Sequence, residues 1–243
     1  STQAKTLFPY TTLFRSADIK KKQQEARSID KQINRLIREA IAESNRRAAM
    51  EKAKAKALAN ANANAKAESK TLTKAETKAE SKKMEREAAA APVSSTKIEL
   101  TPEAKIVADN FRANRGRLPF PVERGFISLG YGDQAHPVYK SLMIHNSGVE
   151  ITTDHGANAR AVFDGVVSSV IVLSPVNKAV MIQHGDFFTV YQNLSSVSVS
   201  KGDKVSRKEI IGKVRTTGDG KSVIKFFVLQ NTTYQNPAGW LSM

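Results

Sequence analysis

The residues most able to do chemistry lie in the C-terminal half of the chain, and the most unusual of them is Lys225. It interrupts the run SVIKFFVL, which otherwise has the composition of a buried β-strand. A protonated lysine has no lone pair to give a metal ion, so it either pairs with a carboxylate or extends into water. Three of the four histidines, His136, His155 and His184, lie beside proline or glycine, where ordinary hydrogen-bonding roles are the usual finding.

The strands that must position these side chains are predicted after Leu118. Segments rich in β-branched and aromatic residues alternate there with turns such as Asp164-Gly165 and His184-Gly185. No segment with the period of a helix separates them, so the sequence predicts a mostly antiparallel β-domain over residues 118–243. Roughly 125 residues are enough to bury a core of their own.

The first part of the chain is dominated by Ala, Lys, Glu, Gln, Asn and Arg, which favour helix or disorder over a β-core. Ile29, Ile33, Leu36 and Ala40 recur in steps of four and three, as the seam between two helices requires. We therefore expect a helical, coiled-coil-like arm over residues 17–60, with a partner for its apolar stripe. Residues 61–98 are predicted to be an Ala/Lys/Glu-rich linker or a fraying helix.

A short helix is predicted within residues 99–117. Thr101 suits the N-cap and Pro102 the first helical position. The apolar residues expected on the inner face, docked on the β-domain, are Ile106, Val107 and Phe111.

Six segments follow one another in the C-terminal part: LPFPVERGFISLGYG, HNSGVEITTDHGANARAVFDGVV, VMIQHGDFFTVYQNL, VSVSKGDKV, EIIGKV and SVIKFFVLQNTTYQNPAGWL. In this order they resemble the LytM or lysostaphin-like zinc endopeptidase domain of bacterial cell-wall metabolism, a β-fold of the duplicated-hybrid-motif type. For active members the resemblance implies the patterns H-x-G-x-D, Y-x-H-L and H-x-H. Residues two or four apart on a strand point to one side, so these spacings aim zinc ligands into one groove.

The sequence departs from that pattern at each of its histidine and aspartate positions. Asn146 stands at the first ligand and Glu150 at the carboxylate, and Asn193 replaces the histidine of Y-x-H-L. Val223 and Lys225 replace the H-x-H pair. The resemblance therefore implies a degenerate site with no metal, no cofactor and no catalytic residue, in which these five residues form a partner-binding groove. Glu150 and Lys225 are expected to form an ion pair where the zinc would lie.

His145 is the best candidate to rescue a metal site with Glu150. It lies five residues before Glu150, and an odd separation sends two side chains to opposite faces of a strand unless a bulge intervenes. An active zinc peptidoglycan endopeptidase is therefore kept as an alternative to a non-enzymatic protein. A wall-binding module whose basic arm holds anionic polymer is the second alternative.

A metallopeptidase-like domain without zinc ligands, preceded by a coiled-coil-like arm, resembles the EnvC-type murein hydrolase activators. The resemblance implies that the groove binds and activates an N-acetylmuramoyl-L-alanine amidase during daughter-cell separation. It further implies that the coiled coil engages a division transporter complex and that a regulatory helix occupies the groove until released. The helix within residues 99–117 is the candidate for that role, with a plain structural brace as the alternative. Peptidoglycan is a further candidate partner.

The formal net charge of +15 suits an anionic partner, but no zinc finger, basic zipper or RNP motif supports nucleic acid, which is not expected to bind. The chain has no cysteine, which excludes disulfides and thiolate chemistry. No apolar run approaches the roughly 18 residues of a membrane span. A location in the periplasm or cell envelope is implied by the resemblance alone.

The segment TLFPYTTLFRS, residues 6–16, is more aromatic than the rest of the arm and resembles a translated sequencing-library adapter. Residues 1–16 are therefore expected to be non-native and carry no weight in the fold prediction. A natural signal peptide and more helix could have preceded Ala17.

Overall fold

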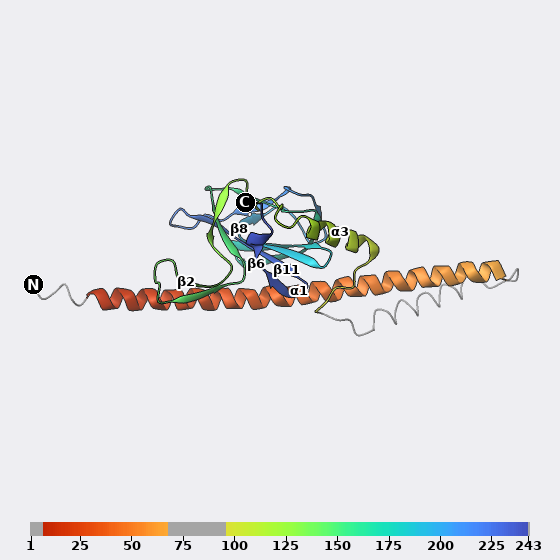
Figure 1. The fold of residues 1–243 in the computed structure, drawn as a ribbon, viewed down its shortest axis with the longest axis horizontal. Coiled ribbons are helices and arrows are strands. Elements are labelled where there is room, and N and C mark those ends of the chain that lie inside the picture. Colours follow the sequence, from red (N-terminus) through yellow and green to blue (C-terminus); the bar gives the residue numbers. More distant parts are fainter. Residues whose placement is uncertain (1–6, 68–95, 243) are drawn as a thin grey trace, which may run out of the picture.

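The computed structural model describes residues 7–67 and 96–242, with side chains described for 17–62 and 96–242. A long helix, α1 (Leu7–Ala67), runs along a β-domain and extends beyond it at both ends (Figure 1). The expected helical arm is thus confirmed, while most of the predicted linker, residues 68–95, lies outside the described residues. Neither described helix combines the length and apolar character of a membrane span.

The β-domain consists, in the described part of the chain, of a ten-stranded sheet and a separate two-stranded hairpin. All strand pairs are antiparallel, and the main order is β1-β4-β11-β8-β7-β6-β9, with β10 joining β5 to β8 and β12 pairing with β11. The strands are β1 (Gly125–Leu129), β2 (Gly132–Ala135), β3 (Met143–Asn146), β4 (Val149–Thr153), β5 (Asn158–Arg160), β6 (Gly165–Ser174), β7 (Asn177–His184), β8 (Phe187–Val197), β9 (Lys204–Val205), β10 (Ile210–Val214), β11 (Ser222–Gln230) and β12 (Thr233–Gln235). A short 3-10 helix, η1 (Pro237–Gly239), follows. The prediction of a mostly antiparallel domain is confirmed.

Strand β11 shows how the sheet separates two apolar cores. Ile224, Phe226 and Val228 belong to the larger core inside the domain, whereas Phe227 and Leu229 belong to a second cluster on the opposite face. This alternation follows the two-residue period of a strand, and all five side chains are fully buried. A central strand buried on both faces explains why SVIKFFVL reads as an almost continuous apolar run.

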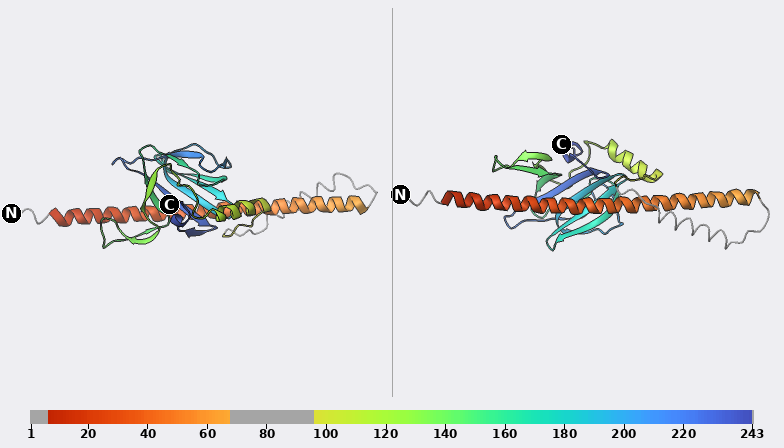
Figure 2. Two further views of the ribbon diagram at one scale, coloured as in Figure 1. Left: turned by 45° about the horizontal axis from the view of Figure 1, so that its top comes forward. Right: turned by 90° about the horizontal axis from the view of Figure 1, so that it is seen from below.

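Helix α1 covers that second cluster. Ile33, Ile37 and Ile41 are fully buried and pack with sheet residues such as Phe188 and Phe227. Figure 2 shows α1 crossing the face of the sheet. Among the described residues the apolar stripe therefore finds its partner in the sheet, which corrects the expectation of a two-helix seam. The reason is that the outer face of β7, β8 and β11 is itself apolar and must be covered.

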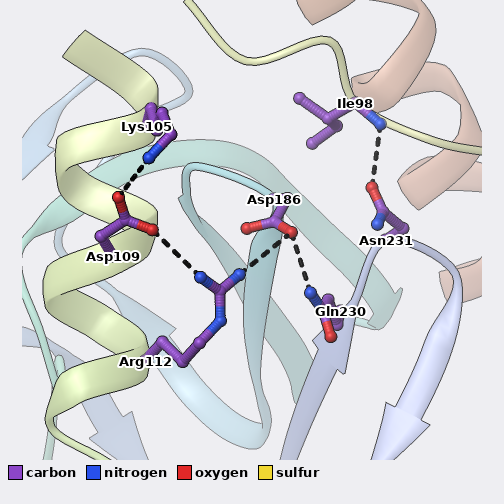
Figure 3. Close-up of polar contacts among 7 residues, drawn as sticks. All are labelled: Ile98, Lys105, Asp109, Arg112, Asp186, Gln230 and Asn231. Carbon is purple, nitrogen blue, oxygen red and sulfur yellow. Dashed lines mark hydrogen bonds and ion pairs between the residues drawn. The ribbon is translucent and has the colours of Figure 1, made fainter. Parts of the chain in front are cut away.

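The chain that leads from α1 to the domain is clamped by two asparagines. The Asn45 side chain donates to the carbonyl of Lys97 at 2.8 Å and accepts from the N–H of Glu99 at 2.7 Å. Between them, the N–H of Ile98 donates to Asn231 Oδ1, in the β11–β12 turn, at 2.8 Å (Figure 3). Asn45 is fully buried, so these bonds fix α1 to the domain at a point far from the helix ends.

The second helix, α3 (Pro102–Ala113), begins as predicted, with the Thr101 hydroxyl accepting from the N–H of Ala104. Its inner face agrees with the prediction at Phe111, which is buried, but differs at Ile106, which is 62% exposed, and at Ala108, which is buried and was not predicted. The cause is the β7–β8 turn: a Cβ at Gly185 would lie only 2.6 Å from Ala108 Cβ and from the carbonyl of Ala104. A turn this close leaves no room for a side chain at residue 185 and room only for a small one at residue 108, so the helix presents Ala108 there.

Aromatic and polar contacts hold α3 in place. The Phe111 ring stacks on His184 with centroids 4.8 Å apart and lies 5.0 Å from Trp240. The Arg112 guanidinium lies over the Phe187 ring and 3.8 Å from Asp186 Oδ2, which also accepts from Gln230 (Figure 3). These contacts make α3 part of the larger core.

The packing of α1 predicts that Ile37→Ala lowers the free energy of unfolding by about 2–5 kcal/mol, because a buried isoleucine leaves a cavity in a cluster shared by helix and sheet. The neighbouring Arg38→Ala, on the exposed side of the helix, should change it by less than about 0.5 kcal/mol. Urea denaturation of the full chain measures both values. Equal stability of the two variants would contradict the packing of α1 on the sheet.

Candidate functional site

A cavity of about 790 Å³ lies between α1 and the edge of the β-domain formed by β1, β4, β11 and the β2–β3 hairpin. Most of its lining is apolar, with charged side chains on both walls. The wall formed by α1 consists of Ile19, Lys22, Gln23, Ala26, Arg27 and Asp30. The facing wall includes Phe126, Ser128, Leu129, Asp133, Met143, Ile144, His145, Asn146, Glu150, Thr152, Val223 and Lys225.

Four of the five predicted groove residues meet in this cavity: Asn146, Glu150, Val223 and Lys225. The pairing of β4 with β11 brings them together, because Glu150 lies directly opposite Lys225 in the register. Asn193 is not among the lining residues. It forms a β-bulge, with φ of 70° and no register partner on β7 or β10, and this bulge interrupts the alternation on which its prediction rested.

Asn146 has a structural use for its amide. The side chain is buried, donates to the carbonyl of Gly130 at 2.8 Å and accepts from the N–H of Gly148 at 3.3 Å. Gly148 in turn permits the close approach of β11, since a Cβ there would lie 2.4 Å from the carbonyl of Phe226. The side chain at the first ligand position therefore shapes the turn into β4.

Glu150 and Lys225 do not form the expected ion pair. No salt bridge within the described residues involves either side chain, although they face each other across two strands. The Lys225 ammonium instead lies 5.3 Å from the centroid of the Phe227 ring. Phe227 is two residues further along β11 and so on the same face, where its π-electrons attract the cation. Both charges are half-buried and without a charged partner in the cavity.

The zinc implied by the LytM resemblance does not fit these side chains. Of the three ligand positions, only Glu150 offers a carboxylate. The Asn146 amide is already hydrogen-bonded to Gly130 and Gly148, and a protonated Lys225 has no lone pair to give. No three His, Cys, Asp or Glu residues of the described chain come together as a metal site. His145 pairs with Asp133 on the β2–β3 hairpin, Nδ1 to Oδ1 2.7 Å. It lines the same cavity as Glu150, which corrects the expectation of opposite faces, because the chain turns between β3 and β4 and the two strands belong to different sheets.

The sequence did not indicate that α1 covers this groove. Asp30 accepts from the Ser147 hydroxyl at 2.8 Å, and Gln23 donates to the carbonyl of Met143 at 3.1 Å. Burial, together with the charge of Asp30, raises the pKa of Tyr234 on the neighbouring β12. The helical period revealed which face of α1 is buried, but a period carries no information about the surface that the face covers.

The helix predicted as regulatory lies elsewhere. None of Ile106, Val107 and Phe111 lines the cavity, and α3 instead packs beside the β7–β8 turn, against Phe187 and Trp240. Its position corresponds to the alternative prediction, a structural brace. The helix that adjoins the groove residues is α1.

Comparison with known families now gives this geometry a context. Residues 144–237 match the model of Peptidase family M23. The match supports a LytM-like domain here. The match begins in β3, which carries Asn146 at the groove. It also includes β4, β8 and β11, which carry the other four predicted residues.

Individual relatives match the same part of the chain. It is 33% identical over 93 residues to the DD-carboxypeptidase/endopeptidase Mpg of Neisseria meningitidis, covering 38% of this chain and 21% of that protein. It is 38% identical over 84 residues to the peptidoglycan DD-endopeptidase ShyA of Vibrio cholerae, covering 34% of this chain and 19% of that protein. A solved structure of Helicobacter pylori Csd3 is 29% identical, with 52% of this chain and 35% of that chain covered and a TM-score of 0.43. The chain spans about a fifth of the length of these two curated relatives.

His184, far from the cavity, has a structural role. It is fully buried, with Nδ1 2.6 Å from the carbonyl of Asp164 and Nε2 2.8 Å from Thr189 Oγ1. Thr189 is hydrogen-bonded to the Tyr191 hydroxyl, which accepts from the N–H of Val162. Burial lowers the pKa of His184 to about 4.

The chain should consequently lose stability on acidification because of His184. In the unfolded state the His184 imidazole binds a proton below its ordinary pKa of 6.5, whereas in the folded state it does so only below about pH 4. Acidification between these two values therefore lowers the free energy of unfolding progressively. The loss from this group is about 3 kcal/mol. Urea titrations between pH 7.5 and 4.5 measure it, and NMR of the imidazole ring assigns it. A His184 ring that titrates near pH 6.5 in the folded protein would contradict the assignment.

Proposed function

We propose that this protein is a non-catalytic activator of a cell-wall N-acetylmuramoyl-L-alanine amidase. The observation that carries the proposal is the cavity itself. A groove is present in this LytM-like domain although the side chains that line it do not fit zinc. Loss of the ligands removes the metal chemistry but not the surface, and such a surface can take a protein segment. An apolar cleft with a few charged groups is typical of sites that receive a helix.

The activities for which the relatives are named support a role in the cell wall. Mpg and ShyA are named as endopeptidases, the latter on peptidoglycan, so an envelope location and peptidoglycan as a further ligand belong to the proposal. The two ends of α1 that extend beyond the domain offer a surface separate from the groove (Figure 1). We assign to this surface the contact with a division transporter complex.

Helix α1 is divided into two parts that suit an anchored cover. Between Ile33 and Ala48 it contributes five buried residues, including Asn45, whose bonds fix it to the domain. Between Ala17 and Asp30 no residue is buried, and this part forms one wall of the cavity. The second part can therefore leave the groove by local unfolding of its helical turns while the first stays packed, and we propose that it regulates access.

An active endopeptidase is the second candidate, because the named relatives are enzymes and because His145 and Glu150 line one cavity. A joint measurement of bound zinc and of peptidoglycan cleavage separates the two functions. The full chain should bind less than stoichiometric zinc and cleave nothing alone, since the ammonium of Lys225 and the amide of Asn146 do not replace two histidine ligands.

With an amidase added, cleavage of purified peptidoglycan should exceed that of the amidase alone. The peptidoglycan DD-endopeptidase ShyA serves as the positive control for cleavage. Stoichiometric zinc together with cleavage by this chain alone would overturn the activator proposal in favour of the enzyme.

Removal of residues 17–31, which include the α1 wall of the cavity, should increase activation of the amidase. A chain starting at residue 32 keeps the buried isoleucines of α1 but lacks the wall of the cavity, whereas a chain starting at residue 17 keeps both. We expect half-maximal amidase stimulation at an about tenfold lower concentration of the shorter chain, because the groove is no longer partly occupied. Stimulation curves for the two chains decide the matter, and coincident curves would show that this part of α1 does not restrict access.

A further inference from the structure

The two charged side chains at the centre of the groove have no charged partner in the folded chain. Glu150 and Lys225 are half-buried, lie opposite each other in the register and take part in no salt bridge with any described residue. A partly desolvated charge gains most from a partner of opposite sign. The groove therefore presents one carboxylate and one ammonium group at adjacent positions, each without a partner of opposite charge.

The spacing of these charges matches that of side chains on a helix. Residues directly opposite in an antiparallel pair have Cβ atoms about 4.5–5.5 Å apart. Side chains three or four residues apart on a helix are about 5–6 Å apart. One face of a helix can therefore bring an acid to Lys225 and a base to Glu150 at the same time.

The helix that now adjoins the groove leaves both charges without a charged partner. Four pairs of cavity-lining α1 residues are four apart, and none combines an acid with a base: Ile19 with Gln23, Lys22 with Ala26, Gln23 with Arg27, and Ala26 with Asp30. Arg27 and Asp30, three apart, do combine them, but Asp30 already accepts from Ser147. Neither forms a salt bridge with Glu150 or Lys225 among the described residues. Residues 17–30 of α1 show that a helix fits beside this surface, but they leave its charges unmatched.

We propose that the occupant of the groove is an amphipathic helix of a partner protein with an acidic and a basic side chain one turn apart. Its acid meets Lys225, its base meets Glu150, and its apolar side covers residues such as Val223, Leu129 and Phe126, the last of which is 64% exposed. The inference rests on the proposed function and names the feature by which the amidase segment would be selected over α1. Charge complementarity of this kind sets specificity more than raw affinity.

The test uses three labelled helical peptides of about 18 residues, long enough to form a helix when bound. They share one Leu/Ala face and differ at a central pair four residues apart: Glu/Lys, Glu/Glu or Lys/Lys. Charged residues on the opposite face are chosen so that all three peptides have the same net charge. Binding to the full chain is followed by fluorescence anisotropy. The wild type should bind the Glu/Lys peptide about tenfold more tightly than the other two.

Groove variants should change this preference in a defined way. Lys225→Glu leaves two acids and should prefer the Lys/Lys peptide, while Glu150→Lys leaves two bases and should prefer the Glu/Glu peptide. The double variant Glu150→Lys, Lys225→Glu is the matched control: it keeps both charges with their positions exchanged and should again prefer Glu/Lys, with the helix reversed. Circular dichroism verifies that each variant is folded.

One order of preference for all four proteins would overturn the inference, as would the absence of binding by every peptide. The proposed function is tested separately by amidase stimulation. Stimulation by the wild type and by both single variants alike would leave the activator function standing and refute the charge-matched helix. Absence of stimulation together with the predicted changes of peptide preference would refute the activator function and retain the helix-binding groove.

Discussion

The packing of α1 on the outer face of the sheet is the contact on which the rest of the arrangement depends. A sheet of this width has two apolar faces, and the domain core covers only one of them. Ile33, Ile37 and Ile41 cover the other, with residues on β7, β8 and β11. Because a helix is straight over this distance, fixing these three isoleucines also fixes the line that the preceding turns of α1 must follow.

That line leads to the groove because one strand connects the two places. On β11, Phe227 and Leu229 contribute to the cluster under α1, while Val223 and Lys225 line the cavity. The register of β11 shows no bulge, so all four side chains lie on the same face. A helix packed on the C-terminal half of this strand therefore passes beside the former ligand positions on its N-terminal half. The packing of α1 on β11 therefore also places residues 17–30 of the helix beside the groove.

Much of the fold could be predicted from the sequence because turn residues and alternation mark its long strands. The β2–β3 hairpin was missed, since GDQA and MIHN are short and mixed in polarity. The inner face of α3 was assigned by hydrophobicity to Ile106 among others, whereas the real contact beside Gly185 is made by the small side chain of Ala108 and the backbone carbonyl of Ala104. Propensity and pattern describe a segment alone, while these outcomes depend on what another segment brings to it.

In the candidate site, too, the residues on regular strands were predictable and the residue on an irregular strand was not. Counting along strands was enough to bring Asn146, Glu150, Val223 and Lys225 to one cavity, because β4 and β11 are regular where they pair. It failed at Asn193, where a bulge displaces the residue, and such a bulge has no clear sequence signal beyond an asparagine that tolerates a positive φ.

The identity of Lys225 was informative, but its partner was not the nearest carboxylate. In a half-buried site an ammonium can be held by an aromatic face as well as by an acid. Its contact with Phe227 allows Glu150 to remain a separate charge, and two separate charges can distinguish ligands in a way that an internal ion pair, already neutral, cannot.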